Sequence, residues 1–280
     1  MGKWDEIKLL DLYKPLYDLV VKKNLKIANR KKGPLTICPA IKGKNYKEGK
    51  GIMVVGRAIN GWCPLNDIKE EAFLKRLELC SECTLDWVVA RTASDRWLRC
   101  KENLCPFVDN EPADGRSPIT PFWQMVEYIY YQKVCKDLNK NPYDEIVKKA
   151  YDEIVKNAYD EIVWSNLYKA SYAYGGNPAG FYEEQAELCN KILIQEIIKY
   201  KPSEIHFITE KNGRKPGKQS RTWMCDSYQT KAHFKELYDF LEDKENDWTK
   251  KVAVYNRPEF HCKEEIWRSR EHLSGEQIEQ

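Results

Sequence analysis

Short apolar runs alternate with longer amphipathic segments along this chain of 280 residues. Four runs have the length of a buried strand and end in polar residues; they are 51–56, 162–164, 204–209 and 252–255. The segments with helical spacing of apolar residues are 3–31, 67–80, 122–130, 182–200, about 230–246 and the tail after residue 262. This order predicts a three-layer α/β/α fold around a central, mainly parallel four-stranded sheet.

We expect one domain over residues 1–280 with three additions to it. Residues 1–50 are predicted to be an N-terminal helical extension, in which a helix pair precedes a Lys/Gly-rich connection. Residues 63–121 form an insert rich in cysteine and aromatic residues. The sequence Tyr-Asp-Glu-Ile-Val begins at residues 143, 151 and 159. This period is too short for a solenoid and drifts around a helix, so we interpret 143–158 as a duplicated surface segment.

Composition limits the function only loosely. The net charge of +3 comes from 46 basic and 43 acidic residues, so a nucleic-acid surface would have to be a local patch. The N-terminal residues lack the apolar core of a signal peptide, and no apolar stretch is long enough to span a membrane. We expect a cytoplasmic monomer without a membrane partner.

Ten cysteines in such a chain indicate free thiols or a metal site rather than disulfides. Four of them have approximately the spacing of a zinc ribbon, with a second pair that is wider than the usual one; they are Cys80, Cys83, Cys100 and Cys105. A structural zinc ion is the metal this pattern favours, ahead of an iron–sulfur cluster. Buried or free thiols are the alternative interpretation.

Polar loops follow all four predicted strands, at the edge where open α/β sheets bind ligands. The first loop, from Gly56 to Trp62, lacks the third glycine of a dinucleotide fingerprint and the Lys-Ser/Thr of a P-loop. The loop over 211–221 is basic and suits contacts with DNA phosphates, although a solvated loop would look the same. Its candidate backbone contacts are Lys211, Arg214, Lys215, Lys218 and Arg221.

In their order, these strand ends resemble the uracil-DNA glycosylase superfamily over about residues 50–270. Gly-Arg-Ala-Ile-Asn-Gly from Gly56 resembles its Gly-x-x-Pro-Gly loop, which activates water. Ser-Asn-Leu-Tyr-Lys from Ser165, with the later Gly-Asn-Pro, resembles its Asn-x-x-Lys strand end followed by Asn-Arg-x-Pro. Arg-Pro-Glu from Arg257 falls where the family has His-Pro-Ser. The chain thus has Ile59 in place of the family's proline and Arg257 in place of its histidine.

The resemblance implies a monofunctional DNA glycosylase, a hydrolase that flips a base out of double-stranded DNA and needs no cofactor. Asn166 would read the edge of a flipped pyrimidine, and Arg257 would stabilise the departing base anion. Asn60 or a main-chain carbonyl would hold the attacking water. Phe260 would fill the gap in the duplex. The substrate-binding residues implied are Gly56, Arg57, Ala58, Trp62, Tyr168, Lys169, Asn177, Glu259 and Phe260.

A narrower resemblance is to a phage-defence branch of that superfamily, whose members remove glucosylated hydroxymethylcytosine from modified phage DNA. The insert at 63–121 would enlarge the pocket for a base that carries a sugar. Three alternatives remain open at this point. They are a uracil-DNA glycosylase of base-excision repair, a catalytically silent DNA-binding relative, and an interaction protein stabilised by metal at the four cysteines.

Overall fold

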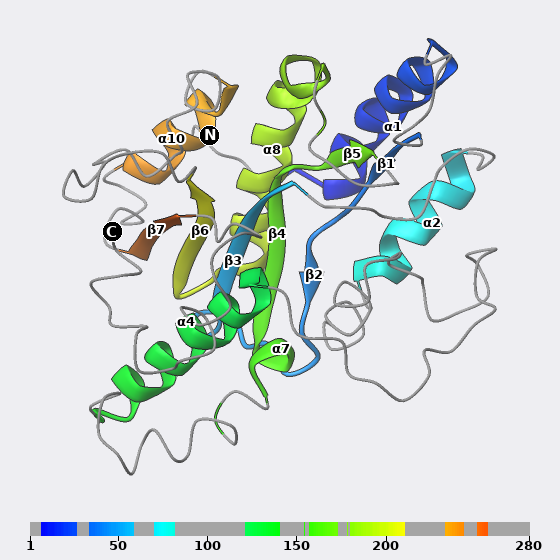
Figure 1. The fold of residues 1–280 in the computed structure, drawn as a ribbon. Helices are drawn as coiled ribbons and strands as arrows, with labels where there is room; N and C mark the ends of the chain where they lie inside the picture. Colours follow the sequence, from blue (N-terminus) through cyan, green and yellow to red (C-terminus); the bar gives the residue numbers. More distant parts are fainter. Residues whose placement is uncertain are drawn as a thin grey trace.

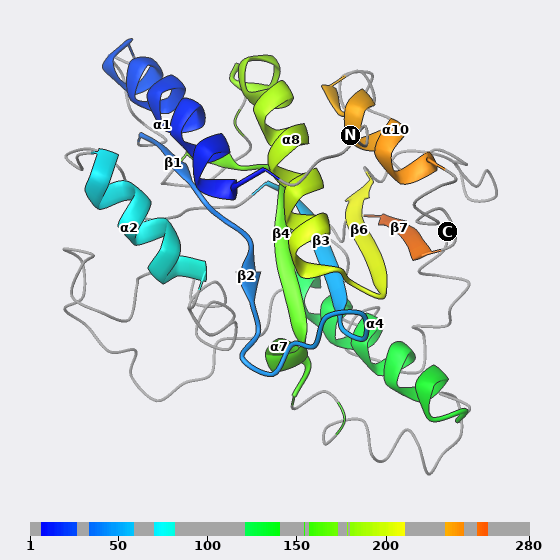
Figure 2. The ribbon, with the colours of Figure 1, turned by 180° about the vertical axis from the view of Figure 1, so that it is seen from behind.

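The computed structural model describes residues 7–26, 34–58, 70–81, 121–140, 154, 157–172, 178, 180–210, 233–243 and 251–256. Within these ranges the fold is mixed α/β, with a mostly parallel sheet of five strands and helices on both of its faces (Figures 1 and 2). None of the helices described there has both the length and the hydropathy needed to cross a bilayer.

The main sheet contains all four predicted strands and one more. Its order is β2 (Ile41–Lys42), β4 (Ile162–Tyr168), β3 (Ile52–Ala58), β6 (Glu204–Glu210) and β7 (Val252–Asn256). The four predicted strands run parallel, whereas β2 pairs antiparallel with the outer edge of β4. The expected count of four strands was therefore too low. The two residues of β2 lie in a Lys/Gly-rich stretch and are too few to show the alternation of apolar and polar residues that predicts a strand.

Helices cover the two faces of the sheet through separate cores. On one face, α4 (Pro121–Asp137) packs against the sheet through side chains that include Trp123 and Ile129. On the other face, α8 (Tyr182–Tyr200) and α10 (Lys235–Glu242) pack against the sheet. The side chains of β3 alternate between the cores, so that Val54 faces α4 and Val55 faces α8. Both are fully buried, as expected of a central parallel strand.

The N-terminal extension is only partly helical. One helix, α1 (Leu9–Lys26), contains Pro15 and packs against α8, α2 (Glu70–Ser81) and a second, two-stranded sheet. That sheet joins β1 (Leu35–Ile37) antiparallel to β5 (Ala170–Tyr172). The extension thus supplies β1 and β2 instead of a purely helical segment.

The last copy of the repeated Tyr-Asp-Glu-Ile-Val sequence forms α7 (Ala158–Glu161) and the start of β4. Ile154, from the second copy, packs against the core beneath α4, and Ala158 is fully buried there. The first copy lies outside the described residues. The segment predicted at the surface therefore contributes at least two side chains to the core.

Candidate functional site

The carboxyl edge of the parallel strands is the candidate site, and it lies at the top of the sheet in Figure 1. The helix that follows β4, α8, covers one face of the sheet, and α4, which precedes β4 in the chain, covers the other. The carboxyl ends of parallel strands form the edge at which ligands of open α/β sheets bind. Gly56 and Asn166 face each other across β3 and β4.

The Asn166 side chain is buried at this edge without satisfying its amide. The residue is 2% exposed, and its Nδ2 has no hydrogen-bond partner in the described part of the chain. The side chain occupies the space above Gly56, since a Cβ at that position would lie 2.7 Å from Asn166 Oδ1. The same Cβ would lie 3.4 Å from the ring of Phe122, which is in the first turn of α4. Gly56 is therefore needed for the amide to fit.

The other two buried asparagines of the described ranges are fully engaged. Asn24 donates to the Leu35 carbonyl at 3.0 Å and accepts from the Leu35 N–H at 2.7 Å. Asn190 donates to the carbonyls of Ala186 and His233 and accepts from the Leu237 N–H. An unpaired buried amide costs about 1–3 kcal/mol, so Asn166 is a polar group kept at the expense of stability.

A cationic and aromatic cluster lies at the same edge. The Arg57 guanidinium stands 5.5 Å from the Tyr182 ring centre, and that ring lies 4.6 Å from the ring of Tyr168. The Tyr168 hydroxyl is 2.9 Å from Nδ1 of His233. Burial lowers the pKa of His233, which keeps the imidazole uncharged at neutral pH. Arg57 and Tyr168 were expected at the site, as was Ala58, which pairs with Tyr168 in the sheet.

Tyr182 and His233 were missed by the sequence interpretation. Tyr182 is the first residue of the helix that follows the Gly-Asn-Pro loop. Its position directly after a predicted site loop could have indicated that it lies at the site. His233 had none, because it reaches Tyr168 across 65 residues of sequence.

Lys169 is directed away from this edge. Its side chain is fully buried and its Nζ lies 2.6 Å from Glu196 Oε2 and 2.5 Å from Ser165 Oγ. The other Glu196 oxygen accepts hydrogen bonds from the Tyr13 hydroxyl and the Ala40 N–H. Burial and the Glu196 carboxylate raise the pKa of Tyr13, so the phenol stays a donor. We infer that Lys169 ties β4 to α8 and α1 instead of binding substrate.

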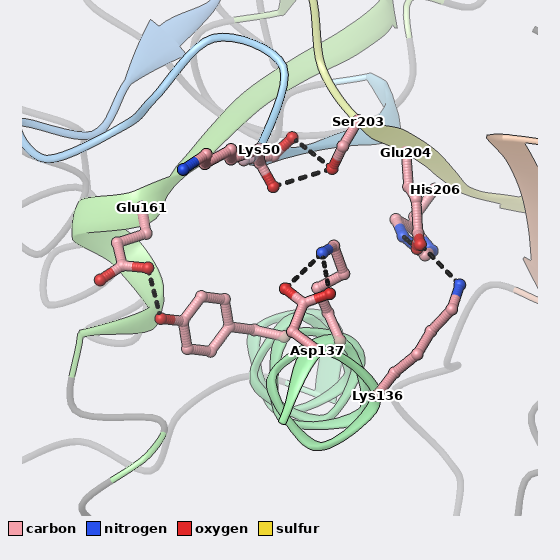
Figure 3. A network of polar contacts seen from close by, with 10 residues as sticks. Lys50, Lys136, Asp137, Glu161, Ser203, Glu204 and His206 are labelled. Atoms are coloured by element: carbon pink, nitrogen blue, oxygen red, sulfur yellow. Dashed lines mark hydrogen bonds and ion pairs between the residues drawn. The ribbon is translucent and has the colours of Figure 1, made fainter. Parts of the chain in front are cut away.

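A second polar network lies at the opposite, amino edge of the sheet (Figure 3). Glu204 begins β6 and accepts from Lys136 Nζ at 2.9 Å, while its second oxygen is 3.3 Å from His206 Nε2. His206 Nδ1 is 3.1 Å from the Tyr255 hydroxyl. The contact with His206, followed by that with Lys136, lowers the pKa of Glu204 to about 2. These contacts join the C-terminal end of α4 to β6 and β7.

Many predicted site residues lie outside the described part of the chain. They are Asn60, Trp62, Asn177, Lys211, Arg214, Lys215, Lys218, Arg221, Arg257, Glu259, Phe260, Cys83, Cys100 and Cys105. Cys80 lies on α2.

Within the described ranges no group of three or more metal-binding side chains occurs. Cys38, Cys135 and Cys189 are buried cysteines, and burial raises the pKa of Cys189 to about 12.

Comparisons of the chain with protein-family models, with curated proteins and with solved structures found no match.

Proposed function

We propose that the chain is a monofunctional DNA glycosylase of three-layer α/β/α architecture. It flips a modified pyrimidine out of double-stranded DNA and hydrolyses the bond between that base and its sugar. The base that we expect is glucosylated hydroxymethylcytosine of phage DNA, and the product is an abasic site. The proposal rests on the strand-end motifs and, above all, on one observation about Asn166.

That observation is the unsatisfied amide at the carboxyl ends of β3 and β4. Asn166 Nδ2 is buried without a partner, on a residue that the strand-end motif assigns to base reading. A pyrimidine edge presents a ring nitrogen and exocyclic groups that a carboxamide can match as donor and acceptor together. Binding of a flipped base would thus supply the missing hydrogen bond and recover the cost of leaving the amide unpaired.

The reaction requires water to attack the sugar carbon C1′ while the bond from C1′ to the base nitrogen breaks. The electron pair of that bond leaves with the base, which then takes up a proton. In our proposal the amide of Asn166 orients the base, and Arg257 offers a charged donor to the base anion. Asn60 or a main-chain carbonyl of the first loop positions the water.

The test is release of a base from DNA of defined modification. The protein is incubated with duplexes containing cytosine, uracil, hydroxymethylcytosine or its glucosylated form, and abasic sites and free bases are measured by mass spectrometry. We expect release from the glucosylated duplex. Release from the uracil duplex alone would identify a repair enzyme, and release from none would overturn the proposal.

Two variants assign the activity to this site. Asn166→Ala is expected to lower single-turnover base release by at least about 100-fold, since both base-reading hydrogen bonds are lost. Asn24→Ala is the matched control, because it removes a buried asparagine from the far end of α1. It is assayed at a temperature where it stays folded, and its single-turnover rate should remain within a few-fold of the wild type. Equal losses in the two variants would show that the effect is structural.

A further inference from the structure

Arg57 is a partly buried cation without an anionic partner in the described part of the chain. Among the residues described here, no carboxylate forms an ion pair with it, and its buried Nε has no hydrogen-bond acceptor. Other partly covered cations do have such partners, since Lys133 pairs with Asp137 and Lys23 with Glu184. The buried Lys169 likewise pairs with Glu196. A guanidinium held at the sheet edge with a free Nε–H is suited to an anion that arrives from outside.

Aromatic contacts hold this guanidinium in place. Its central carbon lies 5.5 Å from the Tyr182 ring centre, within the range of a cation–π contact. Tyr182 in turn packs on Tyr168, which is 1% exposed and is anchored through its hydroxyl to His233. A guanidinium has five N–H donors, and a cation–π contact engages none of them in a hydrogen bond, so they can make a bidentate contact with phosphate or carboxylate oxygens.

The location relates this cation to the base-reading amide. Arg57 follows Gly56, which is the register partner of Asn166, so the two side chains belong to adjacent strands one step apart. They lie on opposite faces of the sheet, since Asn166 is above Gly56 beside α4 whereas Arg57 reaches the first residue of α8. Both groups thus lie at the carboxyl edge of the β3–β4 pair, one toward each face of the sheet.

We propose that Arg57, in cation–π contact with Tyr182, is a phosphate subsite that binds one phosphodiester of the DNA strand whose base is read by Asn166. The choice of DNA rests on the proposed function. The anion-binding property itself rests on the unpaired guanidinium and its aromatic support. Tyr182 is the positioning residue in this subsite, and Arg57 makes the contact.

The experiment measures the affinity of a short DNA duplex as a function of salt concentration. Each phosphate contact contributes roughly one unit to the slope of log K against log salt for duplex DNA, so Arg57→Gln should lower the slope by about one. Its affinity should fall about 3- to 10-fold. Lys50→Gln is the matched control, because Lys50 is an exposed cation at the amino end of the same strand. Its slope and affinity should equal those of the wild type.

Variants of Tyr182 test the support given to the guanidinium. Tyr182→Phe keeps the aromatic face and should bind as the wild type does, whereas Tyr182→Leu should weaken binding toward the level of Arg57→Gln. If Arg57→Gln does not fold, the same question is answered by the wild-type protein and duplexes with single neutral methylphosphonate links. Neutralising one link near the flipped nucleotide should reproduce the loss, and no loss at any link would overturn the subsite.

The outcomes separate this subsite from the glycosylase activity. Binding that depends on Arg57 without release of any base would uphold the subsite and refute the enzyme. Release of a base with an unchanged slope in Arg57→Gln would refute the subsite and uphold the enzyme. Titration with inorganic phosphate provides the last arm. If phosphate binds through Arg57 while DNA affinity does not depend on Arg57, the subsite serves a small phosphorylated compound and the DNA assignment is overturned.

Discussion

Gly56 and Asn166 are register partners on β3 and β4, and the amide of Asn166 fills the space that any side chain at position 56 would need. The pair couples the need for glycine at position 56 to the side chain that we propose reads the base. A residue larger than glycine at position 56 has to displace the group that we assign to base reading. Stability and function at this edge of the sheet should therefore respond together to substitution of Gly56.

Gly56→Ala is expected to destabilise the protein by about 1–2 kcal/mol, because the new Cβ would lie 2.7 Å from Asn166 Oδ1. The cost should be much smaller in an Asn166→Ala background, where that oxygen is absent. Urea denaturation of the two single variants and the double variant measures the coupling. Additive losses would show that the two side chains do not compete for this space.

Asn166→Leu is expected to leave the free energy of unfolding unchanged or to raise it by up to about 1 kcal/mol, since it removes an unsatisfied buried amide and keeps the branched shape of the side chain. Asn190→Leu is the comparison, because Asn190 is equally buried but makes hydrogen bonds through both ends of its amide. That variant should lose about 2 kcal/mol or more. Equal losses in thermal or urea denaturation would mean that Asn166 is retained for structure.

The four parallel strands could be predicted from sequence because each is a short apolar run that ends in polar residues. Pattern does not reveal strand register, so the approach of Asn166 to Gly56 could not be predicted, although both residues were expected at the site. The contact of His233 with Tyr168 was unpredictable for the same reason, since it depends on how α10 packs. Two-residue β2 lacked any pattern at all.

Lys169 makes a buried ion pair that the local motif did not predict. It was assigned to substrate binding because it follows the strand end beside Asn166. Its true partner, Glu196, is on α8 among Ile192, Leu193 and Ile197, which the helical pattern correctly predicted to face the core. A carboxylate on a buried helical face requires a partner. The helical pattern of α8 could therefore have predicted that Glu196 pairs with a buried cation, although the strand-end motif did not.

Lys169→Met is expected to destabilise the protein by about 3–5 kcal/mol, because it leaves the Glu196 carboxylate buried without its cation. Lys169→Met with Glu196→Gln should recover most of the loss. The Gln oxygen can still accept from Tyr13 and Ala40, and its amide nitrogen can donate to Ser165. Chemical denaturation gives the free energies.

DNA binding by that double variant then tests the role of Lys169. Its affinity for duplex DNA should match that of the wild type, since the lysine is fully buried beneath α8. A folded double variant with a large loss of affinity would return Lys169 to the substrate-binding residues.

The Glu204 network predicts a defined loss of stability in acid (Figure 3). The folded-state pKa of Glu204 is lowered to about 2, below the value of about 4.3 for an unfolded chain, mainly by His206 and then by Lys136. A lowered carboxyl pKa stabilises the fold above the unfolded pKa, and that contribution is lost as the pH falls from about 4.3 toward 2. Because the Glu204 side chain is 23% exposed, we expect about 1–2 kcal/mol from it after solvent screening.

Glu204→Gln should be less stable than the wild type at neutral pH and should lose less stability over this acid range, as measured by urea denaturation at each pH. Glu48→Gln, at an exposed site near the same edge of the sheet, is the control and should retain the wild-type acid dependence. Parallel stability curves for Glu204→Gln and the wild type between pH 5 and 2 would show that Glu204 is not the titrating group.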